Sequence, residues 1–255
     1  MKKYAIVAVL ILMMLLTACL GASENKINPL GDDGVATVLL DAGHGFGDVG
    51  CTSKYMEGKY EYELNLDFTH RLGEKLSALG YNVLFTHDGK SIISEDELCR
   101  RADKLGINYD DDKIKRNNNI FDAYERTVYA NALAAEKEID LFISIHVNAS
   151  ASSDTATGFE IDYCAENDYS NISKAAFDSI CAKLTEDYQD RILKPFADSW
   201  DMAFVVTKYT NMPSLLFETG FASTPSDALL LLDEEWRDSL MQSLSDGIED
   251  FFKKK

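Results

Sequence analysis

The sequence predicts one α/β domain: a mostly parallel, twisted β-sheet flanked by helices on both faces. Two observations lead to this fold class. Short apolar runs of strand length alternate with amphipathic segments of helix length along most of the 255 residues. Such alternation is typical of strands joined by crossover helices, which pair in parallel. No linker rich in Pro, Gly and Ser interrupts residues 37–255, so this range is expected to form a single domain.

The N-terminal segment predicts export. Lys2 and Lys3 precede an apolar run, residues 5–16, that is short for a membrane span. The run ends in Leu-Thr-Ala-Cys, which resembles the lipobox of bacterial lipoproteins. We therefore expect residues 1–18 to be a lipoprotein signal peptide and Cys19 to carry a lipid anchor. The alternative is an ordinary secretory signal with a chance cysteine.

The segment after Cys19 predicts a flexible tether. Residues 19–36 are polar and cannot bury enough apolar surface to fold alone. The whole chain has a formal charge of −18 at pH 7. This charge argues against nucleic acid as a partner, because phosphate groups need positive side chains. Solubility of an exported surface accounts for the charge equally well.

The first half of the domain begins with a buried strand. Residues 36–43 combine β-branched residues with leucines and end in glycine. Residues 60–80 predict a helix, because Leu64, Phe68 and Leu72 lie on one stripe and Gly80 closes it. Further strands are expected at 81–87 and 139–150, and further helices at 95–106 and 121–138.

The second half continues the alternation. Strands are expected at 157–164, 202–208 and 212–220, and helices at 173–192, 226–232 and 234–252. Functional groups gather beyond the carboxyl ends of the strands in such sheets. His44, His146 and Glu218 all lie at or just past an expected strand end.

The cysteines other than Cys19 do not indicate disulfides. Their spacing resembles neither a CxxC motif nor a small disulfide scaffold: Cys51, Cys99, Cys164 and Cys181. Cys181 shares a helical stripe with Phe177, Ile180 and Leu184, so it is expected to pack in the core.

Three residues form a candidate metal site. Glu61 opens the helix at 60–80 one turn before Leu64, on the stripe that faces the sheet. With His44 and His146 it supplies two imidazoles and a carboxylate, the usual ligand set of a catalytic zinc. A histidine at a strand end is more often a hydrogen-bonded structural residue, so this pattern alone leaves both interpretations open.

Glu218 is the fourth candidate. It ends an otherwise apolar strand, where an ionised carboxylate needs a partner such as a metal-bound water. An exposed strand-end glutamate or a helix cap is the alternative.

Four motifs resemble, in order and local setting, the zinc-dependent N-acetylmuramoyl-L-alanine amidases of the amidase-3 type. They are LLDAGHGFGDVG, YEYELNLDF, ERTVYANALAAEKEIDLFISIHVNAS and MPSLLFETGFAST, and the resemblance covers about residues 37–252. It implies that His44, Glu61 and His146 bind Zn²⁺ and that Glu218 is the catalytic carboxylate. The implied reaction is hydrolysis of the amide between N-acetylmuramic acid and L-alanine in peptidoglycan. Together with the lipobox-like sequence ending at Cys19, the resemblance predicts a membrane lipoprotein facing the cell wall, as for an autolysin.

The chain departs from the family pattern at a few positions. Cys51 stands where a small residue is usual, Thr224 where Asn is usual, and His87 where Arg is usual. His87 is a rival metal ligand, although a histidine at the edge of a loop is the preferred interpretation. His70 is expected to be solvated on the polar side of its helix.

Other motif residues are candidates for orienting the ligands without binding the metal. Asn65 lies one helical turn after Glu61, and Asn148 lies two residues after His146. Structural roles are equally compatible with both, and Arg126 is a further candidate that could simply fasten its helix.

Residues 88–119 form an insertion that is longer than the usual family connection. The insertion leaves from the same rim of the sheet as the expected zinc site, so it is either a wall of the cleft or a solvated peripheral loop.

Two rival functions remain open from the sequence. One is a catalytically silent lipoprotein of the same fold that binds peptidoglycan or regulates another protein. All four expected catalytic positions carry the right residue types, which argues against it. The other is a zinc hydrolase that acts on a different cell-wall bond, such as a deacetylase. Metal ligands alone do not separate it from an amidase, because the same water would attack either amide.

Overall fold

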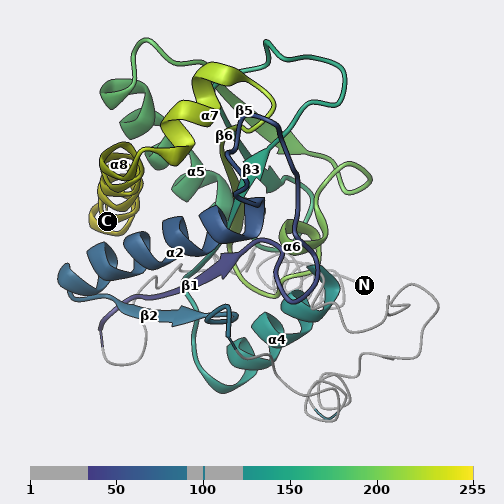
Figure 1. Cartoon of the computed structure of the whole chain (residues 1–255). Helices are drawn as coiled ribbons and strands as arrows, with labels where there is room; N and C mark the ends of the chain where they lie inside the picture. Colours follow the sequence, from purple (N-terminus) through teal and green to yellow (C-terminus); the bar gives the residue numbers. More distant parts are fainter. Residues whose placement is uncertain (1–33, 91–99, 101–122, 255) are drawn as a thin grey trace, which may run out of the picture.

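The computed structural model describes residues 34–90, 100 and 123–254 (Figure 1). The expected signal peptide, Cys19, Cys99, the helix expected at 95–106 and most of the tether and of the 88–119 insertion lie outside this part of the chain. The described elements are β1 (Thr37–Ala42), α2 (Glu61–Ala78), β2 (Asn82–Phe85), α4 (Ala123–Glu136), β3 (Leu141–Asn148), β4 (Phe159–Cys164), α5 (Ser170–Asp187), β5 (Leu193–Asp198), α6 (Val205–Lys208), β6 (Ser214–Phe221), α7 (Pro225–Leu232) and α8 (Glu234–Lys253).

The strands form one six-stranded sheet in the order β2-β1-β3-β6-β4-β5. β2, β1, β3 and β6 pair in parallel, whereas β4 runs antiparallel to β6 and parallel to β5. The predicted mostly parallel sheet is therefore confirmed. The carboxyl ends of β1, β3 and β6 share one edge, which brings the loops after these strands together.

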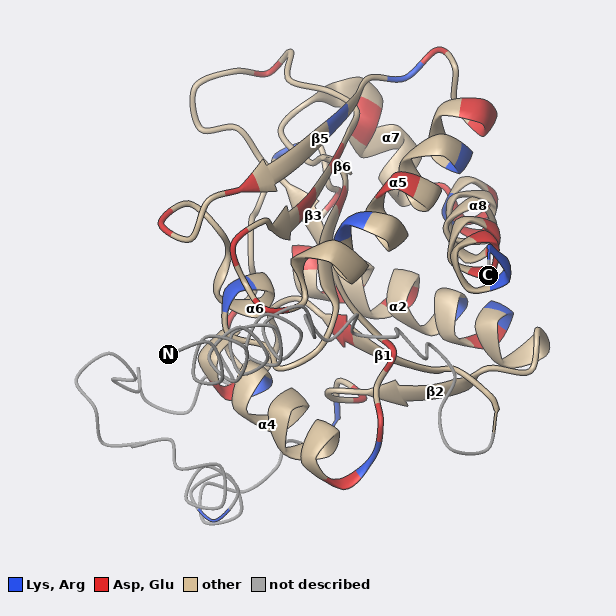
Figure 2. Ribbon diagram, turned by 180° about the vertical axis from the view of Figure 1, so that it is seen from behind, with Lys and Arg blue, Asp and Glu red and all other residues tan. Residues whose placement is uncertain are grey.

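Helices cover both faces of the sheet, as predicted. In both views α2 lies on one side of β1 and β2, and α4 lies on the other (Figures 1 and 2). Alternate residues of β1 supply two separate cores, because successive side chains of a strand point to opposite faces. Val38 and Leu40 belong to the larger core with α2 and α8, while Leu39 belongs to a smaller core with Phe142 and Leu216.

The prediction of a strand at 202–208 is wrong. Residues Val205–Lys208 form the short helix α6, which buries Val206 in the smaller core and leaves Phe204 exposed. The sixth strand is instead β5, which was not predicted. β5 is an edge strand of half-exposed residues and contains Pro195, which cannot donate a ladder hydrogen bond. Its sequence therefore lacks the apolar run that marks a buried strand.

None of the described helices combines the length and the apolar character needed to cross a membrane.

Candidate metal centre and catalytic pocket

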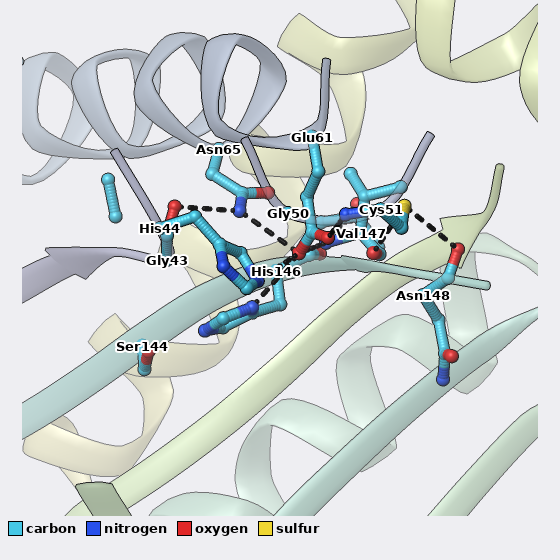
Figure 3. A network of polar contacts seen from close by, with 12 residues as sticks. Gly43, His44, Gly50, Cys51, Glu61, Asn65, Ser144, His146, Val147 and Asn148 are labelled. Atoms are coloured by element: carbon cyan, nitrogen blue, oxygen red, sulfur yellow. Dashed lines mark hydrogen bonds and ion pairs between the residues drawn. The ribbon is translucent and has the colours of Figure 1, made fainter. Parts of the chain in front are cut away.

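The structure brings His44, Glu61 and His146 together. Their ligand atoms all lie within 4.8 Å of one another. Glu61 Oε1 lies 3.2 Å from His44 Nε2 and 3.0 Å from His146 Nδ1, and the three side chains point toward one another (Figure 3). His44 comes from the loop after β1, Glu61 is the first residue of α2, and His146 lies near the end of β3.

The glycine-rich loop after β1 makes room for this cluster. A Cβ atom added at Gly43 would lie 2.3 Å from His146 Nε2, and one at Gly50 would lie 2.6 Å from Glu61 Oε2. His44 itself has a φ of 65°, and its Nδ1 lies 2.7 Å from Asp48 Oδ2. The loop therefore turns the His44 ring toward Glu61 and His146, and it leaves space for their side chains.

Glu61 is buried and held by several donors. Cys51 N donates to Oε2 at 2.6 Å, and Val147 N donates to Oε1 at 3.2 Å. Burial alone would raise the pKa of this carboxyl, but hydrogen bonds to the two imidazoles hold it well below its usual value. Glu61 is therefore ionised at neutral pH, as a metal ligand must be.

Burial favours the neutral form of the His146 imidazole. Burial lowers the pKa of its imidazole below the usual value, despite the opposing effect of Glu61. The neutral ring keeps a lone pair available for a cation.

Glu218 faces the same cavity from β6. Its backbone is the register partner of His146 on β3. Burial raises the pKa of the Glu218 carboxyl well above its usual value, and the nearby Glu61 carboxylate raises it further. In the described part of the chain, the buried Oε2 atom has no hydrogen-bond partner. A buried carboxyl oxygen without a partner is costly, and a cation beside it would favour the ionised form of Glu218.

The four residues line one pocket of about 380 Å³. The pocket also has apolar lining residues: Ala123, Phe204, Val205, Val206 and Leu216. The sequence does not predict that residues 204–206 line this pocket, because the apolar run at 202–208 has the composition of a strand. The aromatic Phe204 in that run is the one sequence signal for this part of the pocket, and it is a weak one.

The residues expected to orient the ligands behave differently from one another. Asn65 Nδ2 donates to Gly43 O at 3.0 Å and to Glu61 Oε1 at 3.3 Å, so it connects two segments of the centre. Asn148 lines the pocket, but its amide donates to Glu160 Oε2 at 2.7 Å and not to a ligand.

Arg126 reaches the pocket wall from α4. Its Nε lies 2.9 Å from Oδ1 of Asp41, and both side chains are buried. Asp41 also accepts hydrogen bonds from Thr86 and Ser144. This buried network ties α4 to β1.

The other histidines lie apart from the ligand cluster. His87 is buried, with Nε2 2.8 Å from Ala42 O, and it is not in the group of potential ligands. His70 is exposed on α2, as predicted.

The described cysteines are free thiols. Cys181 packs against the larger core, as predicted. Cys51 lines the catalytic pocket, where burial and the charge of Glu61 raise the pKa of its thiol. A thiol with a raised pKa is a poor nucleophile, so chemistry in this pocket depends on the other groups.

Comparisons with known proteins agree with this geometry. Residues 38–250 match the family model described as N-acetylmuramoyl-L-alanine amidase. The chain is 30% identical over 222 residues to N-acetylmuramoyl-L-alanine amidase LytC of Bacillus subtilis (strain 168), a match that covers 85% of this chain and 36% of LytC. The chain thus spans little more than a third of the length of that relative.

Two further relatives match over most of their own length. The uncharacterized protein YqiI of Bacillus subtilis (strain 168) is 29% identical over 220 residues, covering 85% of this chain and 84% of YqiI. The crystal structure of N-acetylmuramoyl-L-alanine amidase from Clostridium difficile 630 superposes with a TM-score of 0.63 at 26% identity. This superposition covers 87% of this chain and 98% of that one.

Proposed function

Because the chain belongs to the N-acetylmuramoyl-L-alanine amidase family of the amidase-3 type, we propose that it is a zinc-dependent hydrolase of peptidoglycan. Its substrate is the amide bond that joins the lactyl group of N-acetylmuramic acid to L-alanine of the stem peptide. The observation that carries this proposal is the convergence of His44, Glu61 and His146 with Glu218 in one pocket.

The three proposed ligands fit zinc. Two imidazole nitrogens and one carboxylate are the protein ligands of many catalytic zinc sites. Neighbouring ligand atoms around a tetrahedral zinc lie about 3.3 Å apart when the bonds are about 2.0 Å long. The contacts of Glu61 Oε1 with the two imidazoles, at 3.2 and 3.0 Å, have this spacing. Glu218 Oε2, which is buried in the same pocket without a hydrogen-bond partner among the described residues, fits a site that also binds a water molecule.

The residues of the pocket divide the reaction between them. When bound, zinc supplies Lewis acidity, which polarises the amide carbonyl and makes a water molecule more acidic. Glu218 accepts the proton of the attacking water and then donates it to the departing amine of L-alanine. Asn65 and the backbone N–H groups of Cys51 and Val147 keep the Glu61 carboxylate in place.

We also propose that the protein works outside the cell as a lipoprotein. The apolar run at 5–16 and the lipobox-like sequence ending at Cys19 support a signal peptide at 1–18, a lipid on Cys19 and a tether at 19–36. A lipid anchor would hold the catalytic domain, residues 37–255, between the membrane and its peptidoglycan substrate.

Zinc analysis with a soluble substrate tests the metal assignment. The substrate is N-acetylmuramoyl-L-alanyl-D-isoglutamine, and release of its free dipeptide reports hydrolysis. We expect a chelator to stop hydrolysis by the wild type and added zinc to restore it. His146→Ala should purify with little zinc, because two remaining protein ligands hold it weakly. The matched control is His70→Ala, which removes an exposed histidine outside the pocket and should keep its zinc. Full zinc content in His146→Ala would contradict the assignment.

A further inference from the structure

A second groove, of about 580 Å³, adjoins the catalytic pocket. Its walls are residues 52–55 and 149–154, with Ser223. Both walls continue from the catalytic pocket along the chain. Cys51 lines the pocket and Thr52 lines the groove, while Ala149 lines both. The groove is therefore within reach of a long substrate that extends beyond the candidate metal centre.

The lining of the groove is rich in hydroxyl groups and small side chains. The hydroxyls belong to Thr52, Ser53, Tyr55, Ser150, Ser152, Ser153 and Ser223. Several of these oxygens accept a bond from a backbone N–H: Ser223 from Ser150 at 2.9 Å, and Ser53 from Tyr55 at 3.2 Å. These bonds fix the oxygens in place and leave their O–H groups free to donate elsewhere.

The groove is electrically balanced in a strongly acidic chain. Its charged residues are Lys54 and Asp154, one of each sign, whereas the chain as a whole carries a formal charge of −18. The Lys54 ammonium lies 4.8 Å from the centre of the Tyr55 ring, a cation–π contact that keeps it at the groove. The groove thus offers many neutral donors and acceptors, one cationic donor and one anionic acceptor.

The two halves of the proposed substrate differ in polarity, as do the hydroxyl-lined groove and the apolar residues that line the catalytic pocket. The glycan strand carries hydroxyl and acetamido groups and is neutral near the scissile bond, because the lactyl carboxyl is part of the amide. The stem peptide begins with the methyl group of L-alanine, which suits the apolar wall at Phe204 and Val205. On the basis of the proposed function, we infer that the hydroxyl-lined groove binds the glycan strand and that the stem peptide leaves along the Phe204 wall.

This assignment predicts that the groove matters only for substrates with more than one sugar. Ser152 is exposed in the groove, so Ser152→Trp fills it with an indole ring. We expect kcat/KM on a tetrasaccharide carrying stem peptides to fall about tenfold, the equivalent of one or two lost hydrogen bonds. The rate on N-acetylmuramoyl-L-alanyl-D-isoglutamine should stay near that of the wild type. The matched control is Ser239→Trp, an equally exposed serine on α8 outside both cavities, and it should change neither rate.

A binding measurement separates this inference from the proposed function. Chitotetraose carries neither a lactyl group nor a peptide, and it is titrated into isotopically labelled protein. We expect shifts in the amide signals of 52–55 and 149–154, and weaker binding by Ser152→Trp and Lys54→Ala. If the wild type is active and Ser152→Trp lowers the rates on both substrates equally, or lowers neither rate, the glycan assignment is overturned. The absence of chitotetraose shifts in these loops also overturns it. A wild type that cleaves no muramoyl peptide but shows these shifts overturns the proposed function alone.

Discussion

His146 and Glu218 are register partners on the parallel strands β3 and β6, and both side chains line the catalytic pocket. Register partners on adjacent strands point to the same face of a sheet. This pairing places the proposed base next to a proposed ligand without any help from the loops. Because the strands are buried on both sides, the spacing between the two residues is fixed by the sheet itself.

Replacing Glu218 by glutamine should remove catalysis and keep the metal. The amide has the shape of the carboxylate but cannot accept the proton of water, so kcat should fall by about 10²- to 10⁴-fold. Glu235→Gln is the control, because Glu235 is an exposed glutamate on α8 that does not line the pocket. Rates are compared on the soluble muramoyl dipeptide, with zinc content measured in parallel. Near-normal turnover by Glu218→Gln would refute the assignment of the base.

Gly50→Ala should weaken the metal centre by crowding. The added methyl group would lie 2.6 Å from Glu61 Oε2 and 2.8 Å from His44 Cδ2, so at least one ligand must move. We expect zinc affinity to drop about 10- to 100-fold, the scale seen when groups that position metal ligands are changed. Gly47→Ala is the control, since Gly47 also has a positive φ but a Cβ there meets nothing within 4 Å. Equal zinc affinity in the two variants would show that crowding is not the cause.

Asp41→Asn should destabilise the fold. Asp41 is fully buried, and its carboxylate lies against the buried Arg126 guanidinium. Removing one partner of a buried ion pair costs about 3–5 kcal/mol, which urea denaturation would detect. Asp178→Asn, which removes an exposed partner of Lys174 on α5, is the control and should have little effect. A small loss in Asp41→Asn would mean that the hydroxyl groups around it, and not the charge, hold the network.

The contribution of Asp41 should also depend on pH. Burial alone would raise the pKa of this carboxyl, but Arg126 and the hydrogen bond from Thr86 hold it below its usual value. A carboxyl whose pKa is lowered by folding stabilises the protein above its unfolded pKa, about 3.9. The difference in unfolding free energy between wild type and Asp41→Asn should therefore be constant from pH 5 upward, on the order of the loss given above. It should shrink as the pH falls below about 4.

Much of the fold and of the site follows from sequence patterns. The candidate ligand positions follow from the sequence because His44 and His146 lie at the ends of apolar runs, where a parallel sheet collects polar groups. The helix at Glu61–Ala78 was equally clear, because its apolar stripe is long and Gly80 closes it. These features depend on local periodicity and on residue type.

Other features depend on tertiary contacts that no local pattern records. β5 pairs with a neighbouring strand along one edge only, so its residues need not be apolar. Pro195 also argues against a strand at this position in the sequence. The segment around Val206 has the composition of a strand. It forms the helix α6 instead, and this helix places Val206 in the smaller core. Similarly, the need for glycine at 43 arises from the His146 ring, which is distant in sequence.

Cys19→Ser should release the protein from washed membranes, because acyl chains on Cys19 are the proposed anchor. Cys181→Ser is the control, since Cys181 is a free thiol inside the catalytic domain and should leave the protein membrane-bound. Retention of Cys19→Ser together with an N-terminus that begins beyond the signal peptide would contradict lipid anchoring at this residue.

Digestion of purified peptidoglycan tests the central claim most directly, because the new chemical ends identify the bond that is cut. The mature wild type is compared with Glu218→Gln, and the products are examined by amino-terminal analysis and mass spectrometry. We predict free amino termini on L-alanine and glycan strands of unchanged length from the wild type, and neither product from the variant. New reducing sugar ends, free acetate, or an absence of L-alanine termini in the zinc-loaded wild type would contradict the claim.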